Sequence, residues 1–78
     1  MAADELASLR PYLFSIAYRL VGSASEAEDL VQEAFVRYVA ARPEDVQSER
    51  AYLSTVITRL CLDHLTSARV RREAYVGP

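Results

Sequence analysis

The chain has 78 residues, 51% of them hydrophobic and 26% charged, and its net charge at pH 7 is −2. This length fits one domain, and this composition is typical of a globular protein and not of a disordered one. The sequence has no apolar run of about eighteen residues and no basic stretch ahead of an apolar one at its start, so we expect neither a membrane span nor a secretory signal. Its single cysteine, Cys61, cannot form an internal disulfide, and we expect a cytoplasmic protein.

The first predicted element is a helix that ends at Gly22, a residue that favours helix termination. Its apolar residues recur every three or four positions and form one face: Leu6, Leu9, Leu13, Ile16, Ala17 and Leu20. Pro11 interrupts this pattern because it lacks a backbone donor. We therefore expect either a helix that begins near Arg10 or a longer helix that is kinked at Pro11.

The second predicted helix begins within "SASEAEDLVQEAF", residues 23–35. Ser25 and Glu28 have the spacing of a capping box, so we place the helix start at Ser25. Its apolar stripe is Ala27, Leu30, Val31, Ala34, Phe35 and Tyr38. The helix is expected to end near Ala41, because Pro43 disfavours helical geometry at the residue before it.

The third predicted helix has Ser48 as its N-cap and extends to about Arg72. Its apolar stripe is Leu53, Val56, Ile57, Leu60, His64 and Leu65. Three helices of this length can share one core, so the sequence predicts an all-α fold, a compact three-helix bundle with a short extra turn before Pro11.

Charge is unevenly distributed along the chain. Residues 1–33 hold two arginines and six acidic residues, whereas residues 34–78 hold seven arginines and five acidic residues. Acidic residues in the first turn of the second helix stabilise it through the helix dipole. Gln32 and Glu33 lie beyond that turn and share one exposed face with Asp29, which suits a docking site for arginines of a basic protein partner.

The basic residues of the second half suggest binding of single-stranded nucleic acid, which needs cations for phosphates and flat groups for bases. They are Arg50, Arg59, Arg69, Arg71 and Arg72, with Tyr52 as the aromatic group. Each also has a structural interpretation, since arginines suit a solvated helix end and Tyr52 suits the edge of a core. A sequence pI near 5.3 argues against an ordinary duplex-binding domain.

The sequence contains no set of residues that indicates catalysis or a cofactor site. Cys61 and His64 are one pair of candidate ligands, and a zinc site needs more. We expect Cys61 to be a small buried filler and His64 to face the core or its edge. We predict no enzymatic activity and no cofactor.

Three stretches resemble region 2 of extracytoplasmic-function (ECF) sigma factors of bacterial RNA polymerase. The second helix, "SEAEDLVQEAFVRYVA", resembles the central helix of that region; "RPYLFSIAYRLVGS" resembles the helix before it and "AYLSTVITRLCLDHLTSARVRRE" the helix after it. The ending "RVRREAYVGP" resembles a subgroup with an additional C-terminal domain. The resemblance covers about residues 9–76, and it implies that residues 1–78 are a single region 2 domain from a longer sigma factor.

The resemblance implies a role in transcription initiation with two macromolecular partners. One is the clamp of the RNA polymerase β′ subunit, bound by Asp29, Gln32 and Glu33 with the flanking Glu26 and Glu28. The other is the −10 element of promoter DNA, held as a single non-template strand. The DNA-binding residues would be Arg42, Arg50, Tyr52, Arg59, Arg69, Arg71 and Arg72, with a base flipped into the loop 42–50.

Two alternatives remain open on the sequence alone. The chain could be a helical protein-interaction module whose acidic face binds a basic partner without any DNA. It could also be a helix-turn-helix binder of duplex DNA. The sequence does not say whether an anti-sigma protein or a regulatory domain of the full-length chain is a further partner.

Overall fold

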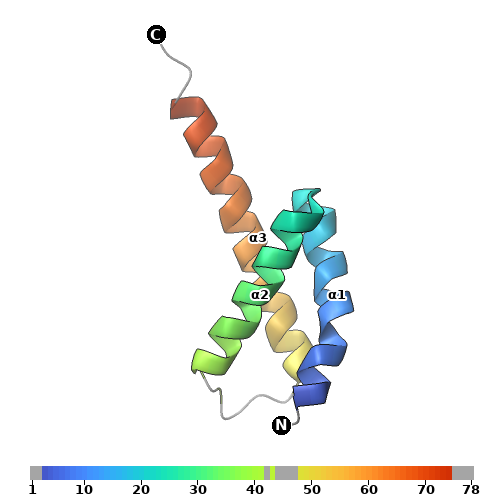
Figure 1. Ribbon diagram of the computed structural model, residues 1–78. Helices are drawn as coiled ribbons and strands as arrows, with labels where there is room; N and C mark the ends of the chain where they lie inside the picture. The colour runs from blue at the N-terminus through green and yellow to red at the C-terminus, as the bar shows by residue number, and fades with distance from the viewer. Residues whose placement is uncertain (1–2, 42, 44–47, 75–78) are drawn as a thin grey trace.

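A computed structural model of the chain describes the backbone of residues 3–41, 43 and 48–74, and the side chains of residues 6–41, 43 and 48–71. These ranges contain three α-helices and no strand: α1 (Ala3–Val21), α2 (Ala24–Ala41) and α3 (Glu49–Ala74). α1 and α3 run in one direction and α2 runs in the other (Figure 1). The predicted all-α, three-helix fold is confirmed.

The first helix passes through Pro11 without a break. α1 begins at Ala3, so the expectation of a helix start near Arg10 was wrong, as was that of only a short extra turn before Pro11. Pro11 cannot donate to the carbonyl of Ala7, but both residues are exposed, and water can satisfy that carbonyl. The apolar contacts of α1 on either side of Pro11 then outweigh the missing hydrogen bond.

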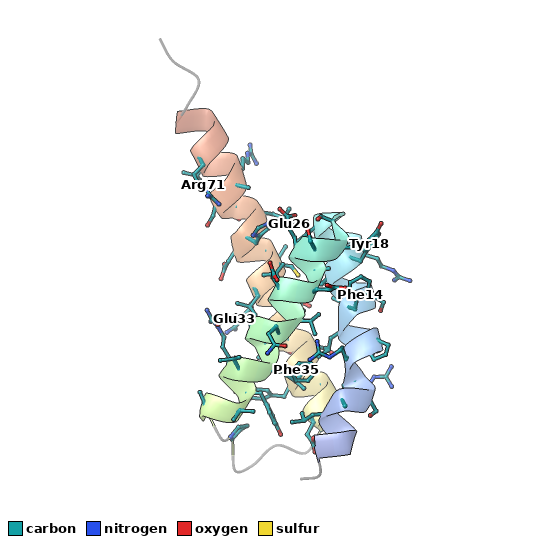
Figure 2. The ribbon with its side chains drawn as sticks, in the orientation of Figure 1. Phe14, Tyr18, Glu26, Glu33, Phe35 and Arg71 are labelled. Atoms are coloured by element: carbon teal, nitrogen blue, oxygen red, sulfur yellow. The ribbon has the colours of Figure 1, made fainter. Side chains whose placement is uncertain are left out.

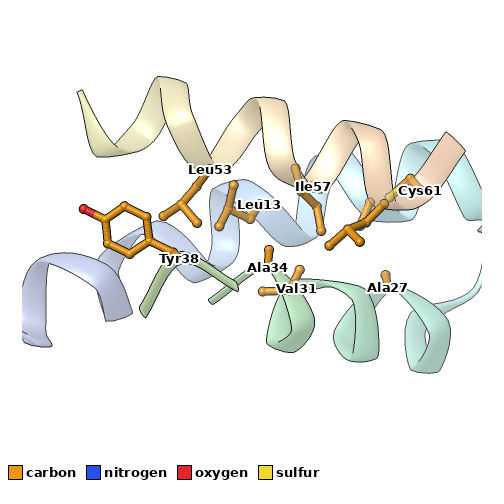
Figure 3. Close-up of a cluster of buried hydrophobic side chains, with 10 residues drawn as sticks. Leu13, Ala27, Val31, Ala34, Tyr38, Leu53, Ile57 and Cys61 are labelled. Carbon is orange, nitrogen blue, oxygen red and sulfur yellow. The ribbon is translucent and has the colours of Figure 1, made fainter. Parts of the chain in front are cut away.

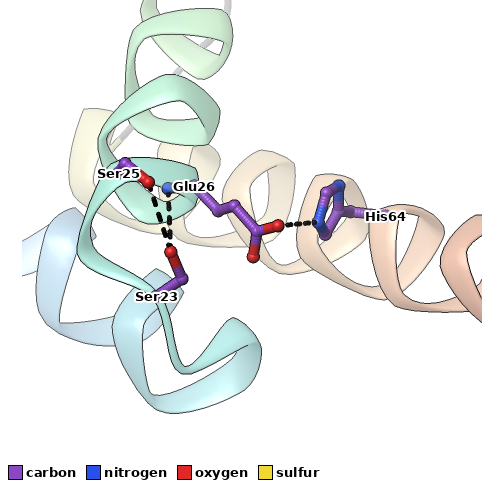
Figure 4. A network of polar contacts seen from close by, with 4 residues as sticks. All are labelled: Ser23, Ser25, Glu26 and His64. Carbon is purple, nitrogen blue, oxygen red and sulfur yellow. Dashed lines mark hydrogen bonds and ion pairs between the residues drawn. The ribbon is translucent and has the colours of Figure 1, made fainter.

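A two-residue connection joins α1 to α2. Gly22 has φ of 73°, a left-handed conformation that glycine adopts without strain, and its N–H donates to the Tyr18 carbonyl at 2.9 Å. Ser23 caps α2, because its Oγ accepts from the Glu26 N–H at 3.4 Å and its carbonyl accepts from the Ala27 N–H at 2.9 Å (Figure 4). The prediction of Ser25 as the cap was therefore wrong by two residues.

The end of α2 and the start of α3 lie where the sequence predicted them. α2 ends at Ala41, two residues before Pro43. Ser48 caps α3: its Oγ accepts from the Ala51 N–H at 3.2 Å, and its carbonyl accepts from the Tyr52 N–H at 3.0 Å. The helix then continues to Ala74, slightly beyond the predicted end at Arg72.

The core is one apolar cluster to which every helix contributes (Figure 3). Its members are Leu13, Ala17, Ala27, Val31, Ala34, Tyr38, Leu53, Ile57, Leu60 and Cys61. All except Cys61 belong to the predicted apolar stripes, and Cys61 is the buried filler that was expected. Burial raises the pKa of the Cys61 thiol, which makes it a poor nucleophile at neutral pH.

The second half of α3, residues 62–74, which we call the projecting half, lies beside the start of α2 at His64 and then extends past the ends of α1 and α2 (Figure 1). Leu65 was predicted as a core residue, and this was wrong: it is exposed there, as are Leu62 and Val70. His64 lies at the edge of the bundle, with 30% of its side chain exposed. No helix in the described ranges combines the length and the apolar character that crossing a bilayer requires.

Candidate functional site

The acidic side of α2 is fully on the molecular surface. All five residues that were predicted to bind polymerase are exposed: Glu26, Glu28, Asp29, Gln32 and Glu33. We call this set the outer face of α2. It lies opposite the buried Ala27, Val31 and Ala34, as the helical spacing requires.

One edge of the outer face borders α1. Glu28, Asp29 and Gln32 line a groove of about 560 Å³ whose other wall is formed by residues of α1. Arg10 of that wall donates from Nη2 to Gln32 Oε1 at 3.3 Å, and its guanidinium carbon lies 5.2 Å from the centroid of the Phe35 ring. Within the described part of the chain, Glu28 and Asp29 have no hydrogen-bond or ion-pair partner, so their carboxylates are open to an external cation.

The other edge of the outer face borders α3. Glu33 Oε2 accepts from Arg37 Nε at 3.0 Å, one turn along the same helix. Glu26 Oε1 lies 3.4 Å from His64 Nε2 of α3 (Figure 4). Glu26 and Glu33 are seven residues apart, which is two turns of α2, and Figure 2 labels both. The side chains of Glu26 and Glu33 are each 48% exposed, so water reaches both contacts. A cation of a binding partner could therefore replace Arg37 or His64 beside these carboxylates.

A second groove, which we call the α2–α3 groove, has a volume of about 370 Å³. Its lining residues are Arg37 and Ala41 of α2 with Tyr52, Val56, Arg59, Leu60 and Asp63 of α3. It brings together Tyr52 and Arg59, two of the residues that were predicted to bind DNA. The Tyr52 ring is partly buried and packs edge to face on Tyr38, with centroids 5.4 Å apart, so it is also the core-edge residue of the alternative interpretation.

The remaining predicted DNA-binding residues lie outside this groove. The Arg50 guanidinium carbon lies 4.1 Å from the centroid of the Tyr12 ring, between α1 and α3. Hydrogen bonds with Ser54 and Arg50 lower the pKa of the Tyr12 phenol. Arg69 and Arg71 are exposed on the projecting half of α3, where Figure 2 labels Arg71.

Some of the predicted site falls outside what the structure describes. Arg42 and the residues 44–47 of the loop lie outside the described residues, and so does the side chain of Arg72. The prediction that this loop receives a flipped base stays a prediction. Among the described residues, no three histidine, cysteine or acidic side chains are grouped as a metal site would need.

Two charged residues near the predicted site were missed in the sequence. Arg37 follows Glu33 by four residues, the spacing of a helical ion pair, and this was the available signal. Glu49 precedes Tyr52, Val56 and Arg59 at helical spacing, which places it on the groove side of α3. Its Oε2 is buried without a hydrogen-bond partner, and its negative charge adds to the effect of burial in raising the pKa of Tyr38.

The described geometry can be compared with known proteins. A family model for sigma-70 region 2 matches residues 6–71. The chain belongs to the sigma-70 region 2 family. This confirms the family that the three helical stretches resemble.

Two relatives of this region 2 domain are ECF sigma factors of Mycobacterium tuberculosis. ECF RNA polymerase sigma factor SigJ is 49% identical over 78 residues, which cover 99% of this chain and 24% of that protein. A protein named probable ECF RNA polymerase sigma factor SigI is 52% identical over 64 residues, 82% of this chain and 22% of that protein. The chain thus spans about a quarter of the length of these relatives. No solved structure matches it.

The region 2 domain presents two surfaces of different chemistry, and α2 contributes to both. The outer face of α2 supplies carboxylates and an amide. The α2–α3 groove supplies two arginines and part of an aromatic ring. Arg37 is the residue that touches both, since it pairs with Glu33 and lines the groove.

Proposed function

We propose that this domain acts in transcription initiation by binding two macromolecules at once. The outer face of α2 binds the β′ clamp of RNA polymerase, and the α2–α3 groove holds the melted non-template strand of the promoter −10 element. The observation that carries this proposal is the family match over residues 6–71 together with the exposure of Asp29, Gln32 and Glu33. The names of the two relatives, both RNA polymerase sigma factors, support it.

The exposed carboxylates of the outer face support the polymerase contact. Carboxylates form short, bidentate hydrogen bonds with arginine, and these are among the stronger polar contacts in proteins. Asp29 has no partner within the described residues, and Glu33 has only a solvent-exposed one. The amide of Gln32 can both donate and accept hydrogen bonds, so it can fix the orientation of the partner more closely than charge attraction alone does. A clamp surface with two or more arginines would fit this face.

The residues that line the α2–α3 groove support the DNA contact. Arg37 and Arg59 can neutralise phosphates in the groove that Tyr52 also lines, while Val56 and Leu60 give the groove apolar surface. Stacking of a base on an aromatic ring contributes about 1–3 kcal/mol, and flipping a base out of a duplex costs a few kcal/mol. Because the two terms are similar, this domain would hold an already melted strand and would not open duplex DNA alone.

Two features predict weak DNA binding by the isolated domain. The net charge of −2 repels a phosphate backbone. The Tyr52 ring is partly buried against Tyr38, so only part of its surface can stack on a base. We therefore expect affinity for single strands that falls steeply with salt, and we expect polymerase to supply most of the grip on DNA. The proposed activity is binding, and it requires no cofactor.

A titration of the domain with a purified fragment of the β′ clamp tests the polymerase contact. We expect Gln32→Ala to weaken clamp binding about tenfold, the effect of losing one central polar contact. The pair Asp29→Ala/Glu33→Arg should abolish binding, because it removes one carboxylate and reverses another. Thr66→Ala, an exposed change on the projecting half of α3, is the control. Clamp binding by the double variant at the level of the unchanged domain would refute the polymerase contact.

Labelled oligonucleotides test the DNA contact. We expect the domain to prefer a single-stranded −10 sequence over its duplex, and we expect Arg59→Ala to reduce the discrimination between bases at one position. Unchanged base preference in Arg59→Ala would remove that residue from the specificity site. Clamp binding without any single-strand binding would favour the protein-interaction module, and a preference for duplex would favour helix-turn-helix recognition.

A further inference from the structure

Arg37 stands at the boundary between the two proposed surfaces. Its Nε donates to Glu33 Oε2 at 3.0 Å on the outer face of α2. The same side chain lines the α2–α3 groove, where Arg59 and Tyr52 face it from α3. The side chain is 61% exposed, so it is free to reorient in water. One guanidinium therefore has two possible destinations, a carboxylate of its own helix or an anion in the groove.

We propose that Arg37 is a phosphate contact of the α2–α3 groove, and that its ion pair with Glu33 withholds it until a partner's cation engages Glu33. This inference rests on the two-surface binding proposed above and adds a coupling between the surfaces. When an arginine of the partner pairs with Glu33, the Arg37 guanidinium loses its intramolecular partner. Its charge then becomes available to a phosphate that lies along the groove beside Arg59.

The exchange is feasible because the pair is exposed and local. Ion pairs four residues apart on a helix surface are weak, and water screens them. Arginine at a partner surface can bind Glu33 with two parallel hydrogen bonds, whereas the structure shows a single bond from Arg37 Nε. Among the described residues that line the groove, Asp63 is the acidic one, so Asp63 competes for Arg37 on that side.

The proposal requires a definite thermodynamic relation between the partners. If binding at Glu33 increases affinity for DNA, then DNA in the groove must increase affinity for the partner by the same factor. A purely structural role predicts something different. If the ion pair only stabilises α2, neutralising either member would change DNA affinity no more than neutralising another exposed residue of the same charge does.

A double-mutant cycle in DNA binding separates these interpretations. The probe is a fluorescently labelled single-stranded oligonucleotide, titrated with the domain at several NaCl concentrations. The variants are Arg37→Gln, Glu33→Gln and the two combined. Arg19→Gln removes an exposed arginine from the last turn of α1 and controls for the loss of one positive charge, and Asp29→Asn controls for the loss of one negative charge.

We expect Arg37→Gln to weaken binding about threefold and to reduce the slope of log K against log salt by about 0.7, the value for one phosphate contact to a single strand. Arg19→Gln should change neither quantity by as much. Glu33→Gln should tighten binding more than Asp29→Asn does, because it frees Arg37 as well as removing a charge. That additional gain should vanish when Arg37→Gln is also present.

Each result decides something. Binding of Arg37→Gln equal to that of Arg19→Gln would overturn the role of Arg37 while leaving single-strand binding intact. If Glu33→Gln still increases DNA affinity more than Asp29→Asn does when Arg37→Gln is also present, the ion pair with Glu33 does not keep Arg37 from the DNA. Absence of any binding by the unchanged domain would overturn the proposed DNA contact, and this inference with it. Circular dichroism of each variant should give unchanged helix content, since all the substituted residues are exposed.

Discussion

The two halves of α3 belong to one continuous helix and have opposite environments. In the first half, Leu53, Ile57 and Cys61 are completely buried against α1 and α2. In the second half, Leu62 and Val70 are about half exposed, and the helix extends past its neighbours (Figure 1). Both halves carry apolar residues among charged ones. The face of α3 on which a residue lies and the reach of the neighbouring helices together decide which apolar residues of α3 form the core.

The halves therefore depend on different forces. The first half is held by apolar burial, which is the main stabilising term in a small domain. The second half depends on intrinsic helix propensity and on local charges. These contributions make a helix of that length only marginally stable in water. We expect the first half to unfold only with the whole domain and the second half to fray independently.

The largest expected effect is the loss of one core leucine. Leu53→Asp would bury an unpaired carboxylate at a position with no solvent exposure, and we expect it to remove about 4 kcal/mol or more, most of the stability of a domain this small. Leu62→Asp makes the same chemical change in the projecting half and should stay within about 0.5 kcal/mol of the unchanged domain. Urea unfolding followed by circular dichroism measures both. Similar losses in the two variants would contradict the comparison.

An intermediate effect is expected at the start of α3. Ser48→Ala removes the Oγ that accepts from the Ala51 N–H, and we expect it to lower the free energy of global unfolding by about 1 kcal/mol. Ser67→Gly lowers helix propensity at an exposed position of the projecting half by a similar local amount. Its cost should appear as faster amide hydrogen exchange beyond Leu62, with the urea midpoint unchanged. An equal shift of the urea midpoint in both variants would show that α3 unfolds as one unit.

The smallest expected effect concerns the contact at the junction of the halves. His64 Nε2 lies 3.4 Å from Glu26 Oε1, and it ties the start of the projecting half to α2 (Figure 4). Because both side chains are partly exposed, Glu26→Gln should cost about 0.5 kcal/mol or less in global stability. Hydrogen exchange should nevertheless become faster at Leu65 and beyond. Ser25→Ala is the neighbouring control. Identical rates of amide hydrogen exchange in Glu26→Gln and Ser25→Ala would show that the contact with His64 does not stabilise the second half of α3.

The sequence predicted the helices well because their ends carry strong local signals. Gly22, Pro43 and Ser48 each act through their own backbone or a hydrogen bond within one turn, and the structure agrees with all of them. Ser23 and Ser25 show where this fails. Both stand three residues before a glutamate, so the capping-box spacing fits either, and the hydrogen bond from the Glu26 N–H to Ser23 Oγ is what distinguishes them.

Other features of the fold depend on contacts between helices, which the sequence of one helix does not show. Leu65 continues the apolar stripe of α3, but nothing in that stripe tells where α1 and α2 end beside it. Pro11 left two possibilities open, a helix start near Arg10 or a longer helix, and packing on both sides of Pro11 favours the longer one.

For the candidate site, helical spacing correctly placed Asp29, Gln32 and Glu33 on the surface opposite the core. It could not show which cations lie near which groups. Arg50 was grouped with Tyr52 and Arg59 because they are close in sequence, yet it lies over the Tyr12 ring of α1. Arg37 was overlooked because its role depends on α3 lying beside it.

The connection between α1 and α2 has a mechanical consequence. A Cβ added at Gly22 would meet no atom within 4 Å, so a larger side chain there would not collide with its surroundings. The positive φ would still cost an alanine about 1–2 kcal/mol of backbone strain. The direction in which α2 leaves α1 therefore depends in part on the left-handed backbone conformation of Gly22, and so does the orientation in which α2 presents its carboxylates.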